Sequence, residues 1–109
     1  ALNLRSRLFH VNTVPQSAVA VRRDAFLQAG GYDESLRFAE DYELWLRMSR
    51  TRLFACSHVI TVNYRIHDRQ ATRNLSRMIS GSWTARRKEL AWVQAQGSAA
   101  EVACVNELL

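Results

Sequence analysis

Hydrophobic and polar positions follow a helical period after a pair of glycines near the middle of the chain. Gly30 and Gly31 interrupt the chain, and a short polar segment then leads to Glu40. Positions i, i+3, i+4 and i+7 of the next stretch share one helical face and hold, in order, Asp41, Leu44, Trp45 and Met48. The pattern predicts an amphipathic helix that begins at Glu40 or Asp41.

The opposite face of this helix carries charges, which the pattern predicts to be solvated: Glu40, Glu43, Arg47 and Arg50. Glu43 and Arg47 form a favourable i, i+4 pair. Asp41 differs because it leads the apolar face, where a carboxylate is costly to desolvate unless hydrogen bonds satisfy it. Free N–H groups of the first turn can do so. Asp41 is therefore either an ordinary N-terminal helix carboxylate or a functional acid.

Three stretches have the composition or the alternation of β-strands. Ser17–Val21 reads as a buried strand, Arg52–Cys56 as a short strand, and Val59–Ile66 as an alternating strand. In the third stretch every second residue is apolar, so Arg65 and His67 project together from the polar face.

The remaining segments favour helices. Asp24–Ala29 predicts a brief helix stopped by a left-handed Gly30, whereas Ala1–His10 fits a helix or a strand. A helical pattern starts at Asp68, with a break expected at Gly81. Further boundaries follow along the chain: a helix over Trp83–Gln96, a stop at Gly97, and a last helix after the capping box Ser98–Glu101.

Composition limits the class of protein. With 109 residues the chain is at most one domain. Fourteen arginines against the single Lys88 and a net charge of +5 favour anionic partners. Cys56 and Cys104 have no metal-binding spacing, which favours a reducing, cytoplasmic compartment. The sequence shows no membrane span and no leader peptide.

Chemistry-bearing residues also gather after the third predicted strand. The sequence contains no G-x-G-x-x-G, P-loop, H-E-x-x-H or G-x-S-x-G motif. His67 is either a hydrogen-bonded histidine or a metal ligand among arginines that bind a diphosphate. Arg69, Arg73 and Arg77 recur every four residues, as a solvated helix face or as an anion-binding stripe.

Four motifs carry a family resemblance, in the order R-R-D-A-F, G-G-Y-D-E, E-D-Y-E-L-W-L-R and Y-R-I-H. Together they resemble the C-terminal, acceptor-side half of a family 2 glycosyltransferase with the GT-A fold. The resemblance covers Ser17–Arg73. It implies an α/β fold fragment in which residues 1–109 form one partial domain, with residues 17–73 carrying the family motifs and residues 74–109 forming a helical tail.

The resemblance also implies an inverting sugar transfer. Asp41 is then the general base, in an E-D motif shared with Glu40, and His67 completes a site for Mg²⁺ or Mn²⁺. The expected partners are a nucleotide-sugar donor and a glycan or lipid-linked acceptor, in the cytoplasm or at the membrane periphery. The expected substrate-binding residues are Gly30, Gly31, Trp45, Arg65, Arg69 and Arg73.

Two features of the family are missing from the sequence. There is no D-x-D pair, so we expect a fragment that is inactive alone, and no Q-x-x-R-W signature, which favours a non-processive enzyme. Two other classes remain open. One is a small basic module that binds nucleic acid or acidic surfaces through Arg69, Arg73, Arg77 and Arg86–Lys88, although nucleic acid leaves the acidic motif unexplained. The other is an interaction domain that forms homo-oligomers through exposed apolar surface.

Overall fold

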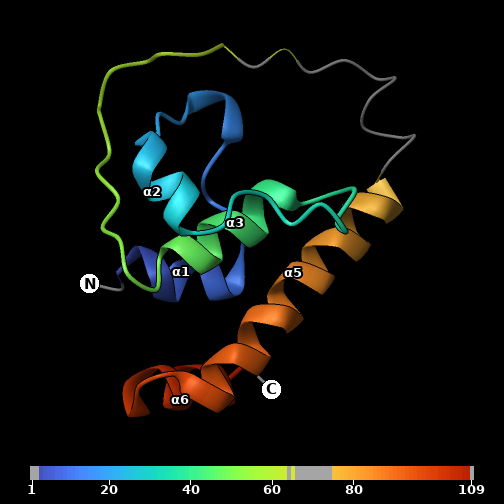
Figure 1. The fold of residues 1–109 in the computed structure, drawn as a ribbon. Coiled ribbons are helices and arrows are strands. Elements are labelled where there is room, and N and C mark those ends of the chain that lie inside the picture. Colours follow the sequence, from blue (N-terminus) through green and yellow to red (C-terminus); the bar gives the residue numbers. More distant parts are fainter. Residues whose placement is uncertain (1–2, 64, 66–74, 109) are drawn as a thin grey trace.

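The protein is a set of helices gathered around one short central helix. The structure, a computed structural model, describes residues 3–63, 65 and 75–108. Figure 1 shows the path of the chain, whose elements are α1 (Leu4–His10), a 3₁₀ turn (Gln16–Ala18), α2 (Arg23–Gln28), α3 (Glu40–Met48), α5 (Leu75–Gln96) and α6 (Ala99–Asn106).

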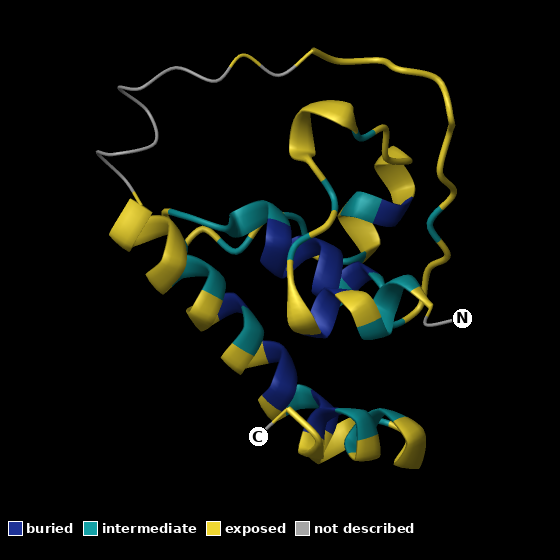
Figure 2. Ribbon diagram, turned by 180° about the vertical axis from the view of Figure 1, so that it is seen from behind, coloured by how far each residue is buried: buried dark blue, intermediate teal, exposed yellow. Residues whose placement is uncertain are grey.

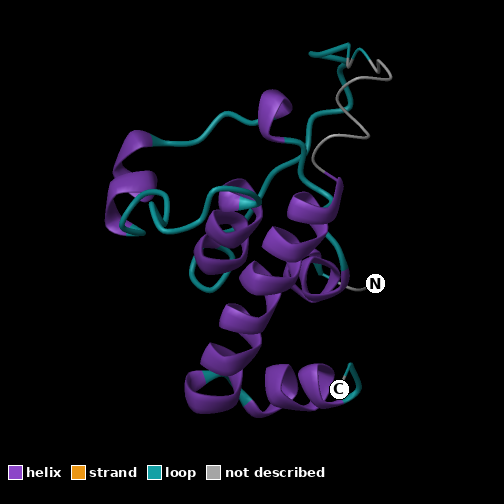
Figure 3. Ribbon diagram, turned by 90° about the vertical axis from the view of Figure 1, so that its right-hand side faces the viewer, coloured by secondary structure: helices purple, strands orange, loops and turns teal. Residues whose placement is uncertain are grey.

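The expected α/β fragment of a GT-A fold is wrong for the part of the chain that the structure describes. Helices and loops are the only elements there, and no strand is present (Figure 3). Ser17–Val21 contributes to the 3₁₀ turn and then runs extended, Arg52–Cys56 is loop, and the described residues of Val59–Ile66 form no ladder. Alternation reports which way side chains face, but a strand also needs a neighbouring backbone to hydrogen-bond.

Helix α3 lies at the centre, and this explains why most of its surface is buried (Figure 2). It packs against α1 on one side and the long α5 on another, while α6 closes against α1 and α5. Because of this packing Glu43 is buried, although the sequence predicted that the charged face of the helix is solvated. The fully or nearly fully buried apolar residues are Leu8, Phe9, Ala25, Tyr42, Leu44, Trp45, Leu46, Met48, Ala85, Leu90, Val93 and Val105.

The predicted helix ends are confirmed where the signal is local. After α2 the N–H of Gly30 donates to Leu27 O and the N–H of Gly31 to Phe26 O, each at 3.0 Å. Both glycines have positive φ, so they form a Schellman C-cap. Ser98 and Glu101 form the reciprocal capping box that starts α6.

The predicted break at Gly81 is wrong, because α5 runs unbroken from Leu75 to Gln96. Gly81 instead allows a close approach of the chain. A Cβ at Gly81 would lie 2.6 Å from the carbonyl oxygen of Phe38, so only glycine fits beneath this backbone. The loop before α3 therefore rests directly on α5. Although α5 is long, no helix among the described residues combines the length and the apolar content that crossing a membrane requires.

Candidate functional site

Asp41 stands in the first turn of α3 as a half-buried carboxylate. One oxygen, Oδ1, accepts the N–H of Tyr42 at 2.8 Å, and Oδ2 lies 3.4 Å from Nδ2 of Asn12. The Asn12 amide is itself oriented, because its Oδ1 accepts the N–H of Val14. Among the described residues Asp41 makes hydrogen bonds but no ion pair.

The residue before the E-D pair has an unusual backbone conformation. Ala39 has φ +60° and ψ +26°, the left-handed region, and its side chain provides no cap for the helix. An alanine in this region costs on the order of 1 kcal/mol. The turn therefore brings Glu40 and Asp41 out of the preceding loop at a fixed angle. Glu40 is also half-buried and, like Asp41, has no ionic partner among the described residues.

Trp45 lies on the same face as Asp41, one turn further on, and belongs to the core. It is 2 % exposed and packs edge-on against Phe54, with ring centroids 6.3 Å apart. Its indole N–H is buried and has no partner among the described residues. In this arrangement Trp45 supports the helix and does not line an open surface.

The glycine turn is tied to α3 by one arginine. Arg47 donates to the carbonyl oxygens of Ala29 and Gly31, the second at 2.6 Å, while its other edge meets the Glu43 carboxylate at 2.8 Å and 3.0 Å. Gly30 is exposed and Gly31 is half-buried. The turn is thus held rigidly against the helix that carries Asp41.

Glu43 is the centre of a buried ionic network that the sequence analysis missed. Its side chain is 3 % exposed and contacts both Arg47 and Lys88, whose Nζ lies 2.9 Å from Oε1. Lys88 also reaches Asp33 at 2.8 Å, which joins the loop, α3 and α5. Burial raises the pKa of Glu43, but hydrogen bonds from Arg47 and Lys88 outweigh burial and leave the pKa lowered. The i, i+4 pair of Glu43 with Arg47 was predicted; the Lys88 contact spans 45 residues and has no local signal.

A second network connects α1, α3, α5 and α6. Glu89, 3 % exposed, accepts from Arg5 at 2.9 Å and from Arg50 at 2.5 Å. Arg5 also binds Glu101, and the Arg50 guanidinium lies 3.9 Å from the centre of the Trp92 ring. These arginines hold the helices together, which composition alone did not indicate.

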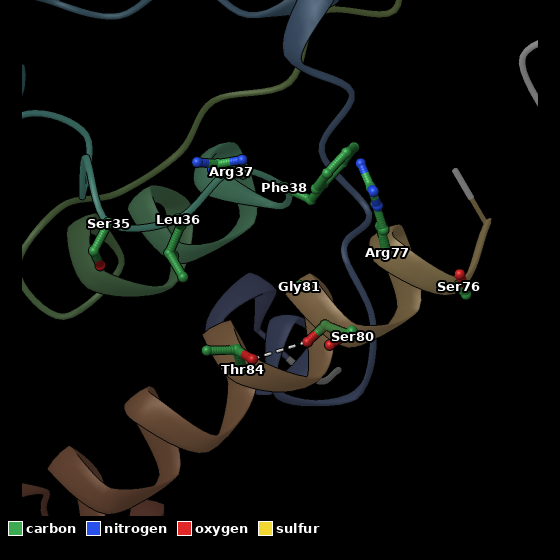
Figure 4. Close-up of a pocket in the computed structure, with 9 residues that line it drawn as sticks. All are labelled: Ser35, Leu36, Arg37, Phe38, Ser76, Arg77, Ser80, Gly81 and Thr84. Atoms are coloured by element: carbon green, nitrogen blue, oxygen red, sulfur yellow. Dashed lines mark hydrogen bonds between the residues drawn. The ribbon is translucent and has the colours of Figure 1, made fainter. Parts of the chain in front are cut away.

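An open cleft of about 630 Å³ lies between the loop before α3 and the first half of α5 (Figure 4). Two arginines, Arg37 and Arg77, supply its charge, and hydroxyl groups make up much of the remaining polar lining. Asp41 is not among the lining residues, although the loop leads directly into its helix. The lining residues are Ser35, Leu36, Arg37, Phe38, Ser76, Arg77, Ser80, Gly81 and Thr84.

Only some of the expected cationic and metal-binding residues belong to the described part of the chain. Arg65 is exposed in a loop. His67, Arg69 and Arg73 lie outside the described residues. Within residues 3–63, 65 and 75–108, no three His, Cys, Asp or Glu side chains cluster closely enough to hold a metal ion. The described residues therefore do not by themselves fit the expected Mg²⁺ or Mn²⁺.

A hydrogen-bonded carboxylate at the start of a buried helix, which follows a loop that lines a polar cleft, defines a candidate acid–base site. The chain belongs to the glycosyltransferase-like family 2, whose model matches residues 3–99. It is also 36 % identical over 47 residues to an uncharacterized glycosyltransferase of Rickettsia typhi. That match covers 43 % of this chain and 15 % of the relative, so the chain spans a small part of the relative's length. No solved structure matches.

Proposed function

We propose that the protein transfers a sugar from a nucleotide-sugar donor to an acceptor hydroxyl, with inversion at the anomeric carbon and Asp41 as the general base. The observation that carries the proposal is the state of the Asp41 carboxylate. It is fixed by Tyr42 N–H and Asn12, and no cation among the described residues pairs with it. An ionised carboxylate has about four acceptor positions, so it retains room for a substrate hydroxyl.

Glu43 serves as the internal comparison for this proposal. It is on the same helix, yet Arg47 and Lys88 occupy both of its oxygens, and it is almost fully buried. A carboxylate in that state is a structural group, because a base must lie within hydrogen-bond reach of the proton it takes. Of the acids of α3, Asp41 and Glu40 remain, and Asp41 is the one that neighbouring groups hold in position.

In the proposed step the acceptor oxygen attacks the anomeric carbon of the donor. Its proton passes to the Asp41 carboxylate as the new C–O bond forms. The bond from the anomeric carbon to the diphosphate breaks at the same time, and the nucleoside diphosphate leaves with the electron pair. We propose that the acceptor reaches Asp41 past the loop that lines the cleft, and that Gly30 and Gly31 shape the acceptor side because Arg47 fixes their turn.

The donor side of the reaction depends on residues outside the described part. We propose that Arg65, Arg69 and Arg73 bind the diphosphate, and that His67 is one ligand of the expected divalent metal. Transfer in the cytoplasm and inactivity of residues 1–109 alone are parts of the same proposal.

The proposal is tested with Asp41→Asn in the intact protein. Release of nucleoside diphosphate is followed with a panel of nucleotide sugars, and donor binding is measured by calorimetry. Loss of a general base lowers turnover by about 10²- to 10⁴-fold, while donor affinity stays within about twofold. Glu107→Gln is the matched control, since it removes an exposed carboxylate from the end of α6 and leaves turnover unchanged. Unchanged turnover in Asp41→Asn would reject the assignment.

The basic binding module is not favoured by the contacts of its cations. Lys88 pairs with Asp33 and Glu43, and Arg86 donates to the carbonyl oxygen of His10. Two of the three residues in Arg86–Lys88 are thus engaged within the molecule.

A further inference from the structure

Among the described residues, Asn12 is the one whose side chain reaches the Asp41 carboxylate from another part of the chain. Its Nδ2 lies 3.4 Å from Asp41 Oδ2, across 29 positions of the sequence. The other hydrogen bond to Asp41, from the N–H of Tyr42, comes from the same helix and accompanies helix formation. The contact with Asn12 therefore depends on the tertiary fold, and it fixes the carboxylate oxygen that the helix leaves free.

The amide of Asn12 has one orientation that satisfies both of its contacts. Its Oδ1 accepts the N–H of Val14 at 3.2 Å, so its NH₂ group is on the side of the carboxylate. A flipped amide would bring an oxygen against the carboxylate and an NH₂ group against an N–H, and would lose both bonds. Val14 in turn packs against the core, which holds this bend of the chain in place.

The end of α1, just before Asn12, is anchored to two other helices. The Tyr42 hydroxyl donates to the carbonyl oxygen of Leu8, which ties α1 to α3. Arg86 of α5 donates to the carbonyl oxygen of His10. Helix α1 also lies against α3 (Figure 1). Asn12 follows two residues after His10, so packing of the helices, and not a free loop, sets its place beside the start of α3.

The neutral charge of its partner distinguishes Asp41 from other carboxylates of the molecule. Each of the other described carboxylates that bind a side chain of another element meets a lysine or an arginine: Asp33, Glu43, Glu89 and Glu101. A cation at hydrogen-bond distance makes a carboxylate less ready to take up a proton. The Asn12 amide orients one oxygen of Asp41 without a counter-charge, which is the arrangement that a proton acceptor needs.

We propose that Asn12 is a positioning residue for Asp41, whose amide holds Oδ2 in the orientation in which the carboxylate accepts the proton of the acceptor hydroxyl. This role of Asn12 rests on the proposed function of Asp41 as the base. Asn12 supplies one donor to an ion with about four acceptor positions, so the carboxylate keeps room for the hydroxyl. At 3.4 Å the bond is long, as hydrogen bonds of catalytic groups often are before a substrate binds.

The test compares Asn12→Ala and Asn12→Asp in the intact protein, with release of nucleoside diphosphate from UDP-, GDP- and dTDP-linked hexoses as the measure of turnover. Asn12→Ala should lower turnover about tenfold, the lower end of the contribution of a hydrogen bond to a charged group. Donor affinity should stay within about twofold, because Asn12 acts on the base and not on the donor. Asn106→Ala is the matched control, since it removes an exposed amide at the end of α6 and leaves turnover unchanged.

Asn12→Asp separates the hydrogen bond to Asp41 from the bend of the chain. The new side chain keeps an oxygen for the N–H of Val14, so the bend is retained, but it offers Asp41 a second carboxylate in place of a donor. Turnover at pH 7 should fall at least as far as in Asn12→Ala. The pH at which half of the turnover is lost on acidification should rise by about one unit, because one of two adjacent carboxylates is protonated more readily.

The double variant of Asn12→Ala with Asp41→Asn decides whether Asn12 acts through Asp41. A residue that positions the base has nothing to position once the base is gone. The double variant should therefore turn over within about twofold of Asp41→Asn alone. A residue that only supports the fold would lower turnover by the same factor in both backgrounds.

Two results would overturn the proposal while Asp41 remains the base. The first is wild-type turnover in both Asn12 variants when Asp41→Asn is inactive, which would mean that Asp41 works without Asn12. The second is a double variant in which the two losses multiply, which would make Asn12 a structural residue. Wild-type turnover in Asp41→Asn is a different outcome, because it would reject the base itself and with it the role of Asn12.

Discussion

Replacement of Glu43 by glutamine tests whether the buried network holds the site together. The change keeps the size of the side chain and removes one negative charge from between Arg47 and Lys88. In the folded protein an amide then faces two cations at a position that is 3 % exposed. The loop with Asp33, the glycine turn and α5 all connect through this carboxylate.

The size of the loss in the free energy of unfolding depends on the contacts that Arg47 and Lys88 retain in the variant. Removing one member of a buried ion pair costs about 3–5 kcal/mol. Here the cost is reduced, since Lys88 is 47 % exposed and retains Asp33, and Arg47 retains two backbone carbonyls. We therefore expect the free energy of unfolding to fall by about 2–3 kcal/mol, near the value of one to two charged hydrogen bonds.

Urea denaturation of the intact protein measures this difference, provided that the m-value is unchanged. Glu40→Gln is the matched control, because it makes the same change on the same helix at a carboxylate that no described residue pairs with. It should cost less than about 0.5 kcal/mol. A Glu43→Gln variant as stable as Glu40→Gln would refute the network's role.

The pH dependence provides a second check with a defined sign. The pKa of Glu43 is lowered on folding from its ordinary value of 4.5. Its contribution to stability is therefore fully present above pH 4.5 and is lost as the pH falls through the lower, folded-state pKa. The stability difference between wild type and Glu43→Gln should accordingly be constant above pH 6 and shrink below pH 4.5. A difference that grew on acidification would contradict the sign.

Three further changes probe the framework, each measured by urea denaturation. Gly81→Ala should destabilise by about 1–2 kcal/mol, because the clash with Phe38 O exceeds the gain of about 1 kcal/mol in helix propensity. Ala39→Gly should stabilise by about 0.5–1 kcal/mol, since glycine adopts positive φ without strain. Ser98→Ala should cost about 1 kcal/mol through loss of the α6 cap.

Each of these has an outcome that would count against it. A Gly81→Ala variant more stable than wild type would mean that the loop does not rest on α5. Ser80→Ala, at the neighbouring position of the same helix, reports the smaller propensity gain of serine to alanine. A neutral or destabilised Ala39→Gly would argue against strain at that turn. No change for Ser98→Ala would show that Glu101 is held sufficiently by Arg5.

The sequence predicted those features that local chemistry decides. Gly30 and Gly31 predicted a left-handed helix end, and Ser98 with Glu101 predicted a helix start. Both predictions are confirmed. The start of α3 at Glu40 is confirmed as well. In each case the responsible residues lie within four positions of one another.

Features that depend on distant partners were not predictable in the same way. The helical period placed Glu43 on a face predicted to be solvated. In the structure α5 packs against that face, and Lys88 of α5 donates a hydrogen bond to the Glu43 carboxylate. The alternation of apolar and polar residues in Val59–Ile66 is typical of a strand, but alternation does not show whether another strand lies alongside to hydrogen-bond with it. The sequence predicted a helix break at Gly81, because nothing near Gly81 in the sequence indicates that Phe38 packs against it.

The central claim is that Asp41 is the base of a sugar transfer. The most direct measurement is the turnover number of Asp41→Asn in the intact protein at saturating donor and acceptor, together with its donor dissociation constant. The account predicts a turnover at least about 100-fold lower and a donor affinity within about twofold of wild type. Turnover within about threefold of wild type would contradict it.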